Sequence, residues 1–380
     1  MKKLKHPDNM EKAELWRRYA ARQPGRTPVI LGTNPRVVLF NREWNPEGYT
    51  FEQMFSDPQV HVEVVLRHQL YCRTVLNRFT DSPTGLPEEW HIGMHLQNIV
   101  EAAWLGAGID FPSNQVPSTS PILDDARKED IFSQDIDHPL DSPFYRKYKA
   151  LWEEMRRICS TLKYAGRPVK LSPPVFVGTD GPVTVACNLR GTNFLTDLVE
   201  DPEYADRLLI FLTDAAIKRR QACFDAWAIP EKDRGNWMAD DSIALISPGM
   251  YRERVLPLHK RFYETGPRDA VRGMHLCGDA TRHFKTIARE LGVTSFDTGF
   301  PVDHGALRGE LGPDVEILGG PEVALLERGT PDEVYARTRQ ILLSGVRDGG
   351  RFQLREGNNL PPGCPLENLD AMYEACLELR

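Results

Sequence analysis

A histidine and a cysteine lie two residues apart at the end of a strand-like run of the sequence. The run 270–277 ends with His275 and Cys277 and is followed by a glycine. Side chains two apart in a strand point to one face, so the imidazole nitrogen and the thiol sulfur could bind one soft cation. Zinc suits this pair, and an open coordination position would let it lower the pKa of a thiol substrate. The alternative is a buried histidine packed beside a small apolar cysteine.

Carboxylates accompany two further strand-like runs. Asp240 and Asp241 are adjacent within the run 236–246, and one of them could face the pocket as a general base or as a cation partner. Both could instead cap the following turn. Asp297, in the run 293–300, could orient His275 through a hydrogen bond, or be an ordinary turn aspartate.

The last strand-like run, 350–357, is also followed by polar residues. Glu356 and Asn358 share a face there, and Glu356 could supply an oxygen ligand to the metal. Arg355 beside them could bind a substrate carboxylate. The alternative is that this segment only turns into the next helix.

Two histidines in the run 91–97 are further candidates. His91 and His95 are four residues apart and would face one pocket if the segment is extended. For each of them a surface role, or a hydrogen-bonded role in the core, is the alternative.

These residues depend on short β-rich runs that alternate with amphipathic segments. This is the pattern of parallel strands joined by crossover helices, and a closed (β/α)₈ barrel gathers such strand ends at one mouth. We therefore expect an α/β protein with a single TIM-type barrel over 27–380, an N-terminal extension at 1–26, and a long insertion near 110–143, rich in Pro, Ser and Asp. The eight expected strands are 27–34, 91–97, 182–189, 236–246, 270–277, 293–300, 315–320 and 350–357.

The starts of three helices are also marked in the sequence. A capping residue followed by proline stands at 57–58, at 201–202 and at 330–331, each before a long amphipathic segment. Proline at the first position of a helix after an Asp or Thr cap is a strong start signal. We expect helices to begin at these three points.

Composition narrows the classes of partner. The chain has 380 residues and a formal net charge of −7, which does not favour binding to a nucleic-acid backbone. No apolar stretch approaches the roughly 20 residues that span a bilayer, and the charged N-terminus has no apolar segment behind it, so we expect a cytoplasmic protein. The seven cysteines are odd in number and scattered, as expected for thiols. Neither a dinucleotide fingerprint nor a Walker loop occurs.

The C-terminal half resembles the uroporphyrinogen decarboxylase superfamily. The resemblance is carried by HLCGDATRHF and the residues after it to 322, by TPDEVYARTRQIL, and by LREGNNLPPGCPLENL. It is weaker over 27–230. It implies a single distorted barrel with its site at the carboxyl ends of the strands. The superfamily includes the decarboxylase and zinc-dependent, corrinoid-linked methyltransferases.

The positions that handle substrate in the decarboxylases are changed here. Their N-terminal arginine run aligns with Thr33-Asn34-Pro35-Arg36, and their pocket aspartate falls near Gln97 and Asn98. Their tyrosine position reads Asn188 and their late histidine position reads Asn358. A substrate with many carboxylates needs arginines, so we do not expect ordinary uroporphyrinogen decarboxylation. The resemblance leaves a small-molecule site whose predicted contacts are Asn34, Arg36, Asn188, Arg355 and Asn358.

The methyltransferase branch matches more closely. Its zinc ligands include the His and Cys that correspond to His275 and Cys277, whereas its third ligand, a cysteine, corresponds to Asn358. Cys364 lies six residues later and is not an aligned replacement. Glu356, Asn358, a displaced Cys364, or one of His91 and His95 would have to complete the site. The resemblance thus implies zinc as cofactor and a corrinoid protein as partner.

Three functions follow in order of preference. The first is methyl transfer with a metal at the barrel mouth and Asp240 or Asp241 near the substrate. The second is a metal-independent decarboxylase or lyase in which Arg36 or Arg355 holds a small carboxylated substrate. The third is a binding protein that has lost its chemistry. The sequence leaves the substrate and the oligomeric state open, a dimer included.

Overall fold

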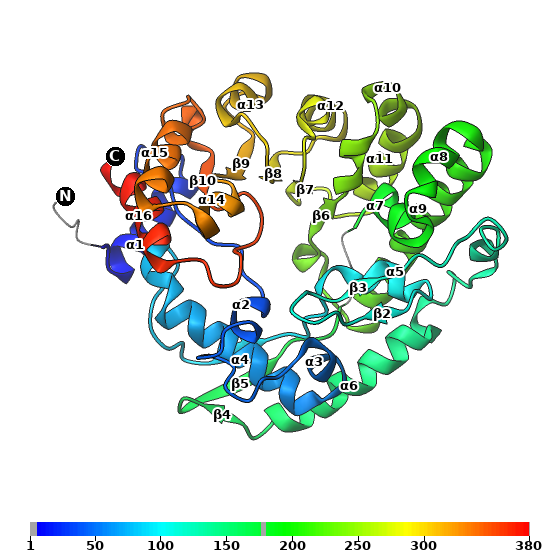
Figure 1. Ribbon diagram of the computed structural model, residues 1–380, viewed down its shortest axis with the longest axis horizontal. Helices are drawn as coiled ribbons and strands as arrows, with labels where there is room; N and C mark the ends of the chain where they lie inside the picture. The colour runs from blue at the N-terminus through cyan, green and yellow to red at the C-terminus, as the bar shows by residue number, and fades with distance from the viewer. Residues whose placement is uncertain (1–5, 176–179, 380) are drawn as a thin grey trace.

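Five parallel strands form the central sheet. The computed structural model describes residues 6–175 and 180–379. The strand order is β10 (Phe352–Leu354), β9 (Glu316–Gly319), β8 (Ser295–Thr298), β7 (Arg272–Leu276) and β6 (Asn236–Ala239), and each neighbouring pair is parallel. Parallel bridges from Val29 to Leu354 and from Asp180 to Ala239 continue the sheet at both edges. The strands lie inside a ring of helices, as in a barrel (Figure 1).

Helices make up most of the rest of the chain. In the first half they are α1 (Asn9–Ala20), α2 (Arg36–Leu39), α3 (Phe51–Ser56), α4 (Pro58–Thr74), α5 (Val100–Trp104), α6 (Pro143–Cys159) and α7 (Pro182–Arg190). In the second half they are α8 (Asn193–Glu200), α9 (Pro202–Ala226), α10 (Pro248–Met250), α11 (Leu256–Glu264), α12 (Thr281–Leu291), α13 (His304–Leu311), α14 (Val323–Arg328), α15 (Pro331–Leu342) and α16 (Leu366–Glu378). Short helical turns include η2 (Gln97–Ile99) and η6 (Asp241–Leu245).

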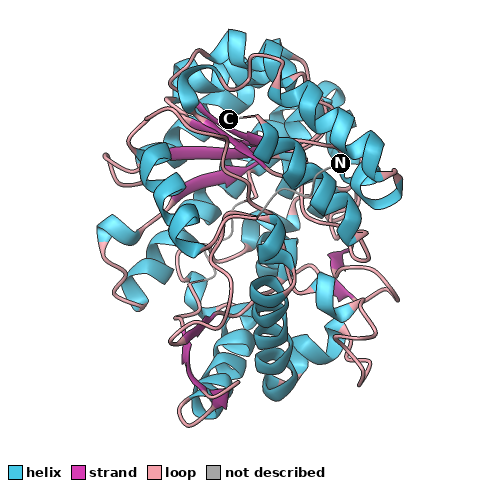
Figure 2. Ribbon diagram, turned by 90° about the vertical axis from the view of Figure 1, so that its left-hand side faces the viewer, coloured by secondary structure: helices cyan, strands magenta, loops and turns pink. Residues whose placement is uncertain are grey.

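A smaller sheet belongs to the N-terminal part of the chain. It consists of β1 (Trp90–Ile92), β5 (Arg167–Leu171) and β4 (Lys163–Tyr164), and β1 pairs with β5 in parallel. It packs with α3, α4 and α6 around an apolar cluster separate from the main core. Figure 2 shows these strands in the lower half of the molecule, apart from the central sheet. The predicted insertion holds only the end of β2 (Ile109–Asp110), β3 (Ser118–Thr119) and short turns.

The three predicted helix starts are confirmed. Asp57, Asp201 and Thr330 cap α4, α9 and α15, and each side chain accepts hydrogen bonds from backbone N–H groups of the first turn. Each cap is followed by proline at the first helical position. Local side-chain chemistry is sufficient for these starts, which is why the sequence alone revealed them.

The strand predicted at 182–189 is wrong, because this segment is helix α7. Its β-branched residues favour a strand locally, but Pro182 occupies the first helical turn. The Asp240 carboxylate accepts the backbone N–H groups of Val183 at 3.3 Å and Thr184 at 2.7 Å. A side chain more than 50 residues away therefore caps the helix, and no local reading of the sequence could supply that cap.

Two other expected strands are shorter than predicted. The run 27–34 contributes only the bridge at Val29, and the run 91–97 leaves the strand after Ile92. Strand β5 was not predicted, since Arg167–Leu171 carries charged and proline residues that match neither strand pattern. The strands predicted at 270–277, 293–300, 315–320 and 350–357 are confirmed as β7 to β10. The run 236–246 is a strand only over Asn236–Ala239, because Asp241–Leu245 forms the helical turn η6.

The N-terminal helix α1 closes the amino-terminal end of the central sheet. The Tyr19 hydroxyl donates to Glu316 Oε1 at 2.8 Å, and Gln353 and Ser295 also donate to this carboxylate at 3.0 and 2.8 Å. Glu316 begins β9, so these bonds lie at the end of the sheet opposite the candidate site. The predicted extension 1–26, whose first five residues lie outside the described range, thus contacts the barrel directly.

All seven cysteines are free thiols, as expected. Within 6–175 and 180–379, no helix combines the length and the apolar character needed to cross a membrane.

Buried His61 makes the fold sensitive to acid. Its Nδ1 bonds the Met54 carbonyl at 2.9 Å and its Nε2 accepts the His95 N–H at 3.1 Å, so the ring has no place for a second proton. Burial lowers the pKa of His61 to about 4. His61 therefore takes up a proton near pH 6.5 in the unfolded chain, but only near pH 4 in the folded chain. The contribution of neutral His61 to the free energy of unfolding is complete above pH 6.5 and is lost as the pH falls toward 4.

We predict that the free energy of unfolding falls less between pH 6.5 and pH 4 in His61→Gln than in the wild type, by on the order of 3 kcal/mol. The free energy of unfolding from denaturant titrations at several pH values measures this. His91→Gln is the control, because the His91 side chain is 71% exposed, and it should retain the wild-type pH dependence. Equal slopes for wild type and His61→Gln would contradict the prediction.

Candidate functional site

Three potential metal ligands meet at the carboxyl ends of β6 and β7. His275 is on β7, Cys277 is the first residue after the end of β7, and Asp241 is the first residue of the turn after β6. His275 Nε2 lies 3.2 Å from Cys277 Sγ and 3.9 Å from Asp241 Oδ1. The three ligand atoms all lie within 4.8 Å of one another. The side chains of the predicted His–Cys pair thus face one point. A carboxylate from the end of the neighbouring strand completes a group of three potential ligands.

This donor set fits zinc. One imidazole nitrogen, one thiolate and one carboxylate oxygen are common zinc ligands, and tetrahedral coordination places such atoms roughly 3.5 Å apart. Three protein ligands leave one position open, as catalytic zinc sites do. The Cys277 N–H donates to Asp241 Oδ1 at 2.8 Å, which holds this carboxylate against the end of β7.

Asp297 orients the histidine, as the sequence suggested. The sheet register places His275 opposite Asp297 on β8. Asp297 Oδ2 lies 2.9 Å from His275 Nδ1, and this leaves Nε2 directed at Cys277. The same oxygen accepts Arg355 Nη1 at 2.8 Å. One carboxylate oxygen therefore fixes both the histidine ring and an arginine from the last strand.

Electrostatics around the three ligands are strongly coupled. Burial disfavours the His275 imidazolium, but the hydrogen bonds to Asp297 and Cys277 and the charges of Asp297 and Asp241 outweigh it and raise the pKa of His275 to about 10. Burial raises the pKa of the Asp241 carboxyl above its usual value, and His275 counteracts this. Perturbed, mutually coupled groups at strand ends are typical of functional sites.

Comparison with known proteins places the chain in a family. The family model described as uroporphyrinogen decarboxylase (URO-D) matches residues 92–379, well over half of the chain. The chain belongs to the uroporphyrinogen decarboxylase family. A methyltransferase structure from Methanosarcina mazei covers 98% of this chain and 99% of its own, with a TM-score of 0.63 and 18% identity, which supports the TIM-type barrel of the URO-D family.

Two relatives of this URO-D family member are methyltransferases of Methanosarcina mazei. The methylated-thiol–coenzyme M methyltransferase is 33% identical over 212 residues, which cover 54% of this chain and 53% of that protein. The methylcobamide:CoM methyltransferase MtbA is 24% identical over 217 residues, which cover 54% of this chain and 59% of that protein. The matched chain thus spans little more than half the length of either relative.

Asp240 is buried scaffold, unlike its neighbour Asp241. It is fully buried, and besides capping α7 it lies 2.9 Å from His259 Nε2, whose Nδ1 contacts the Tyr251 hydroxyl at 3.2 Å. With all its partners inside the protein, Asp240 joins β6 to α7 and α11. The suggestion that it stands near substrate is therefore not supported by its position. The alternative that it caps the following turn is not supported either, because its side chain caps α7 and makes no cap bond to η6.

Glu356 is not part of the three-ligand group. The structure buries it completely, and its Oε1 accepts the Gly32 N–H at 2.8 Å and Arg355 Nη2 at 3.0 Å. Burial raises the pKa of Glu356 to about 7. The predicted metal-ligand role is corrected: Arg355 stands between Glu356 and Asp297, so this carboxylate is bound to an arginine.

The predicted substrate contacts at the N-terminus have internal partners. Arg36 donates to the carbonyls of Asn359 at 2.7 Å and Leu360 at 3.0 Å, so it ties α2 to the last loop. Asn34 Oδ1 accepts the Arg36 N–H at 3.0 Å. Asn188 lies in the last turn of α7, because the segment is helical. The arginine predicted to grip a carboxylate is engaged by the protein itself.

The two histidines of the run 91–97 are separated by the fold. His91 points to the surface and pairs with Glu89 at 3.1 Å, so its predicted place in the pocket is wrong. His95 is half-buried and contacts His61 and Gln97. Burial lowers the pKa of His95 to about 4. The chain leaves the strand at Ile92, and the expected common face is therefore lost.

The last loop lacks a third cysteine ligand. Asn358 stays half-buried there, and its carbonyl accepts Arg355 Nη2. The Cys364 thiol donates to the Leu326 carbonyl at 3.3 Å, on the side of α14. The third potential ligand atom belongs instead to Asp241, in the turn after β6, on the other side of His275.

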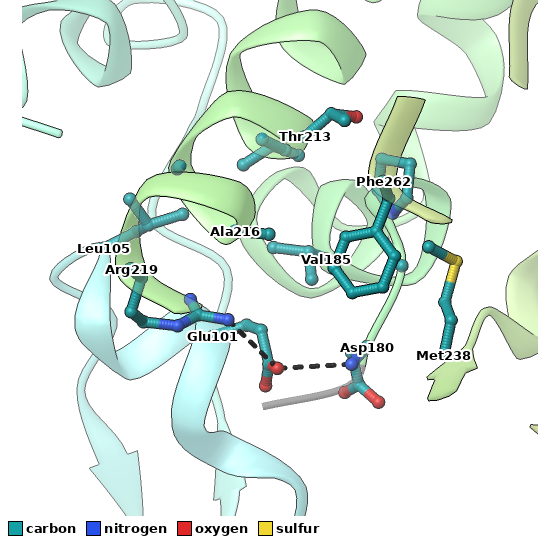
Figure 3. A pocket seen from close by; sticks show the side chains of 13 residues that line it. Glu101, Leu105, Asp180, Val185, Thr213, Ala216, Arg219, Met238 and Phe262 are labelled. Carbon is teal, nitrogen blue, oxygen red and sulfur yellow. Dashed lines mark hydrogen bonds and ion pairs between the residues drawn. The ribbon is translucent and has the colours of Figure 1, made fainter. Parts of the chain in front are cut away.

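Asp180 is a mouth residue that sequence reasoning missed. It is bridged to Ala239, two residues before Asp241, and its N–H donates to Glu101 Oε1 at 3.2 Å. Burial, followed by the charge of Glu101, raises the pKa of Asp180 well above its usual value. The signal was a polar residue before the Gly181-Pro182 helix start. Figure 3 shows Asp180 and Glu101 at one end of a cavity lined by Leu105, Val185 and Phe262.

This cavity is too small for a substrate. Its volume is about 20 Å³, roughly enough for one ordered water. Glu101 and Arg219, both buried, form an ion pair at 3.3 Å on its wall. The cavity therefore serves as part of the scaffold behind the strand ends.

The same Asp-to-Asn substitution should affect different properties at the two adjacent aspartates. We predict that Asp240→Asn costs about 2–4 kcal/mol of unfolding free energy, because three buried donors lose an anionic acceptor. Asp241→Asn, at a side chain that is 43% exposed, should change stability by less than about 0.5 kcal/mol. It should instead weaken zinc binding at least about tenfold.

Denaturant titration and competition with a chromophoric zinc chelator measure the two effects. An Asp240→Asn protein as stable as wild type would contradict the scaffold role. Unchanged zinc affinity in Asp241→Asn would remove this carboxylate from the ligand set.

Proposed function

We propose that this URO-D family member transfers a methyl group, with zinc held by Asp241, His275 and Cys277. The observation that carries the proposal is the meeting of these three ligand atoms at two neighbouring strand ends. Both relatives described above are methyltransferases. When bound, zinc would act as a Lewis acid that lowers the pKa of a thiol.

The chain's own residues prepare this site. Asp297 holds the His275 ring so that Nε2 faces Cys277. The backbone N–H of Cys277 keeps Asp241 in place. In the proposed reaction a small thiol loses its proton to solvent, and its sulfur takes the methyl group from a methylated corrinoid presented by a partner protein. A carbon–sulfur bond forms while the carbon–cobalt bond breaks, and the electron pair of the broken bond stays with the corrinoid. The name of one relative, a methylcobamide:CoM methyltransferase, supports a corrinoid donor.

The lyase alternative has lost its support. It needs an arginine that can hold a substrate carboxylate, and the two candidates were Arg36 and Arg355. Arg36 donates to carbonyls of the last loop, and Arg355 donates to Asp297 and Glu356. Methyl transfer requires neither of them to be available.

Methyl transfer from methylcobalamin to 2-mercaptoethanol tests the proposal. We expect activity in the zinc-loaded protein, loss on chelation and return on adding zinc. Cys277→Ser should lower the rate at least about 100-fold, because the thiolate ligand is removed. Cys364→Ser is the matched control and should keep both activity and zinc. Full activity of chelated protein or of Cys277→Ser would refute the proposed site.

Membership of the family does not imply that this protein decarboxylates uroporphyrinogen. We predict no conversion of uroporphyrinogen to coproporphyrinogen, since Thr33, Asn188 and Asn358 replace the decarboxylase residues and Arg36 is engaged. Product analysis after anaerobic incubation, beside a bona fide uroporphyrinogen decarboxylase, measures this. Coproporphyrinogen formed at a comparable rate would contradict the prediction.

A further inference from the structure

A cavity of about 600 Å³ lies at the amino-terminal end of the central sheet, opposite the candidate metal site. One wall is the end of α1 with the segment 22–28 that follows it. The other wall is the end of α15 with the turn 345–350 that precedes β10. Protein cavities that hold small molecules span about 300–1,000 Å³, so this one is large enough for such a ligand. The proposed methyl transfer makes no use of it.

Arginines from both walls line this cavity. They are Arg18, Arg22, Arg26 and Arg347. Asp348 is the one carboxylate among the described residues that line it. Two of the arginines have carboxylate partners, since Arg22 pairs with Asp314 and Arg26 pairs with Asp81. The charges of Arg18 and Arg347 are then opposed by Asp348 alone, so the cavity keeps an excess of positive charge.

The guanidinium of Arg347 has no acceptor inside the protein. Its side chain is half-buried and lines the cavity, yet within residues 6–175 and 180–379 it makes no hydrogen bond and no ion pair. Arg18 is exposed and donates from Nη2 to the Pro24 carbonyl. Because a guanidinium carries several N–H donors in a planar fork, both arginines can still bind an anion.

These two arginines flank the same stretch of backbone. Arg18 reaches it from α1 through its bond to Pro24. Burial raises the pKa of the Cys376 thiol to about 12, and nearby arginine charges, that of Arg347 included, counteract this rise. The Cys376 thiol donates to the Thr27 carbonyl at 3.1 Å. Arg347 therefore lies near Thr27, and Arg18 lies at the other end of the segment 24–27.

Glycines keep both walls free of side chains beside these arginines. A Cβ added to Gly350 would meet no atom within 4 Å, and one added to Gly25 would meet none closer than 4.0 Å. At Gly345 the nearest atom, Asp348 Oδ2, would be 3.6 Å away. Gly345 and Gly350 have φ values of +91° and +67°, which other residues rarely adopt. The backbone conformation thus leaves space next to Arg347.

We propose that this cavity binds the phosphate group of a small molecule. A guanidinium fork matches two phosphate oxygens, and forks from two walls allow both arginines to contact one phosphate. Leu343, an apolar side chain that is 60% exposed and lines the cavity, would contact the organic part. The site shares no residue with the candidate metal group. The inference therefore goes beyond the proposed methyl transfer and does not rest on it.

Isothermal titration calorimetry with phenyl phosphate, in phosphate-free buffer at low salt, tests the proposal. We expect saturable binding, and Arg347→Gln should weaken it at least about tenfold because one charged fork is lost. Arg18→Gln should weaken it less, and Asp348→Asn should tighten it. Arg207→Gln is the matched control, since it removes the same charge from α9, where Arg207 pairs with Glu129, and it should keep the wild-type affinity.

Three outcomes of the titrations would overturn the proposal. The first is the absence of saturable binding, or equal affinity in wild type and both arginine variants. The second is binding that is lost in Cys277→Ser but kept in Arg347→Gln, which would place the phosphate on the metal. The third is sedimentation of the protein with phosphatidylcholine vesicles that contain phosphatidic acid, without binding of phenyl phosphate, which would indicate a lipid surface.

A measurement on the unmodified chain guards against a variant that fails to fold. Phenylglyoxal modifies accessible arginines, and mass spectrometry of the peptides gives the rate at each site. We expect phenyl phosphate to protect Arg347 and Arg18 at least about threefold and to leave Arg207 unprotected, in proportion to its occupancy of the site. Equal rates at Arg347 with and without saturating phenyl phosphate would overturn the inference.

Discussion

One oxygen atom, Asp297 Oδ2, joins the parts of this site. It contacts the His275 ring from β7 and the Arg355 guanidinium from the end of β10. Arg355 also donates a hydrogen bond to Glu356, and Glu356 accepts a hydrogen bond from the backbone N–H of Gly32. Four segments far apart in the sequence are thereby tied at the carboxyl end of the sheet. Ion pairs that are buried and hydrogen-bonded in this way are costly to break singly, which gives the mouth its fixed geometry.

A second buried carboxylate performs the matching task on the other side. Asp240 caps α7 and contacts His259, so it locks β6 between two helices. This lock leaves its neighbour Asp241 at the rim, turned toward His275 and Cys277. Two adjacent residues of the same type therefore have different functions, because the backbone directs one inward and the other to the mouth.

The candidate ligand set differs from the one that the family resemblance implied. The candidate oxygen ligand, Asp241, follows β6, whereas the resemblance implies a cysteine of the last loop, and that loop instead carries Arg355 and Glu356 as an ion pair. Oxygen is a harder donor than sulfur and gives a metal weaker charge donation.

The sequence by itself determined the features that rest on local chemistry. The His275–Cys277 spacing, the helix starts at Asp57, Asp201 and Thr330, and the strands from 236 onward follow from side-chain periodicity and capping, which act over a few residues. The contribution of Asp297 to His275 also followed, since equivalent ends of parallel strands meet. Each of these could be recognised from neighbours in the chain.

The tertiary structure decided what depends on distant partners. Asp240 and Asp241 are indistinguishable in sequence, and only the N–H groups of α7 assign one to the scaffold. Segment 182–189 became a helix because that distant carboxylate caps it, and His91 turned outward because its neighbours Trp90 and Ile92 in β1 are the residues that the core buries. The sequence predicts that Arg355 contacts substrate and that Glu356 binds the metal, whereas in the structure the two side chains pair with each other beside Gly32. Contacts between residues tens to hundreds of positions apart leave no local pattern, and burial then selects among partners that the sequence leaves equivalent.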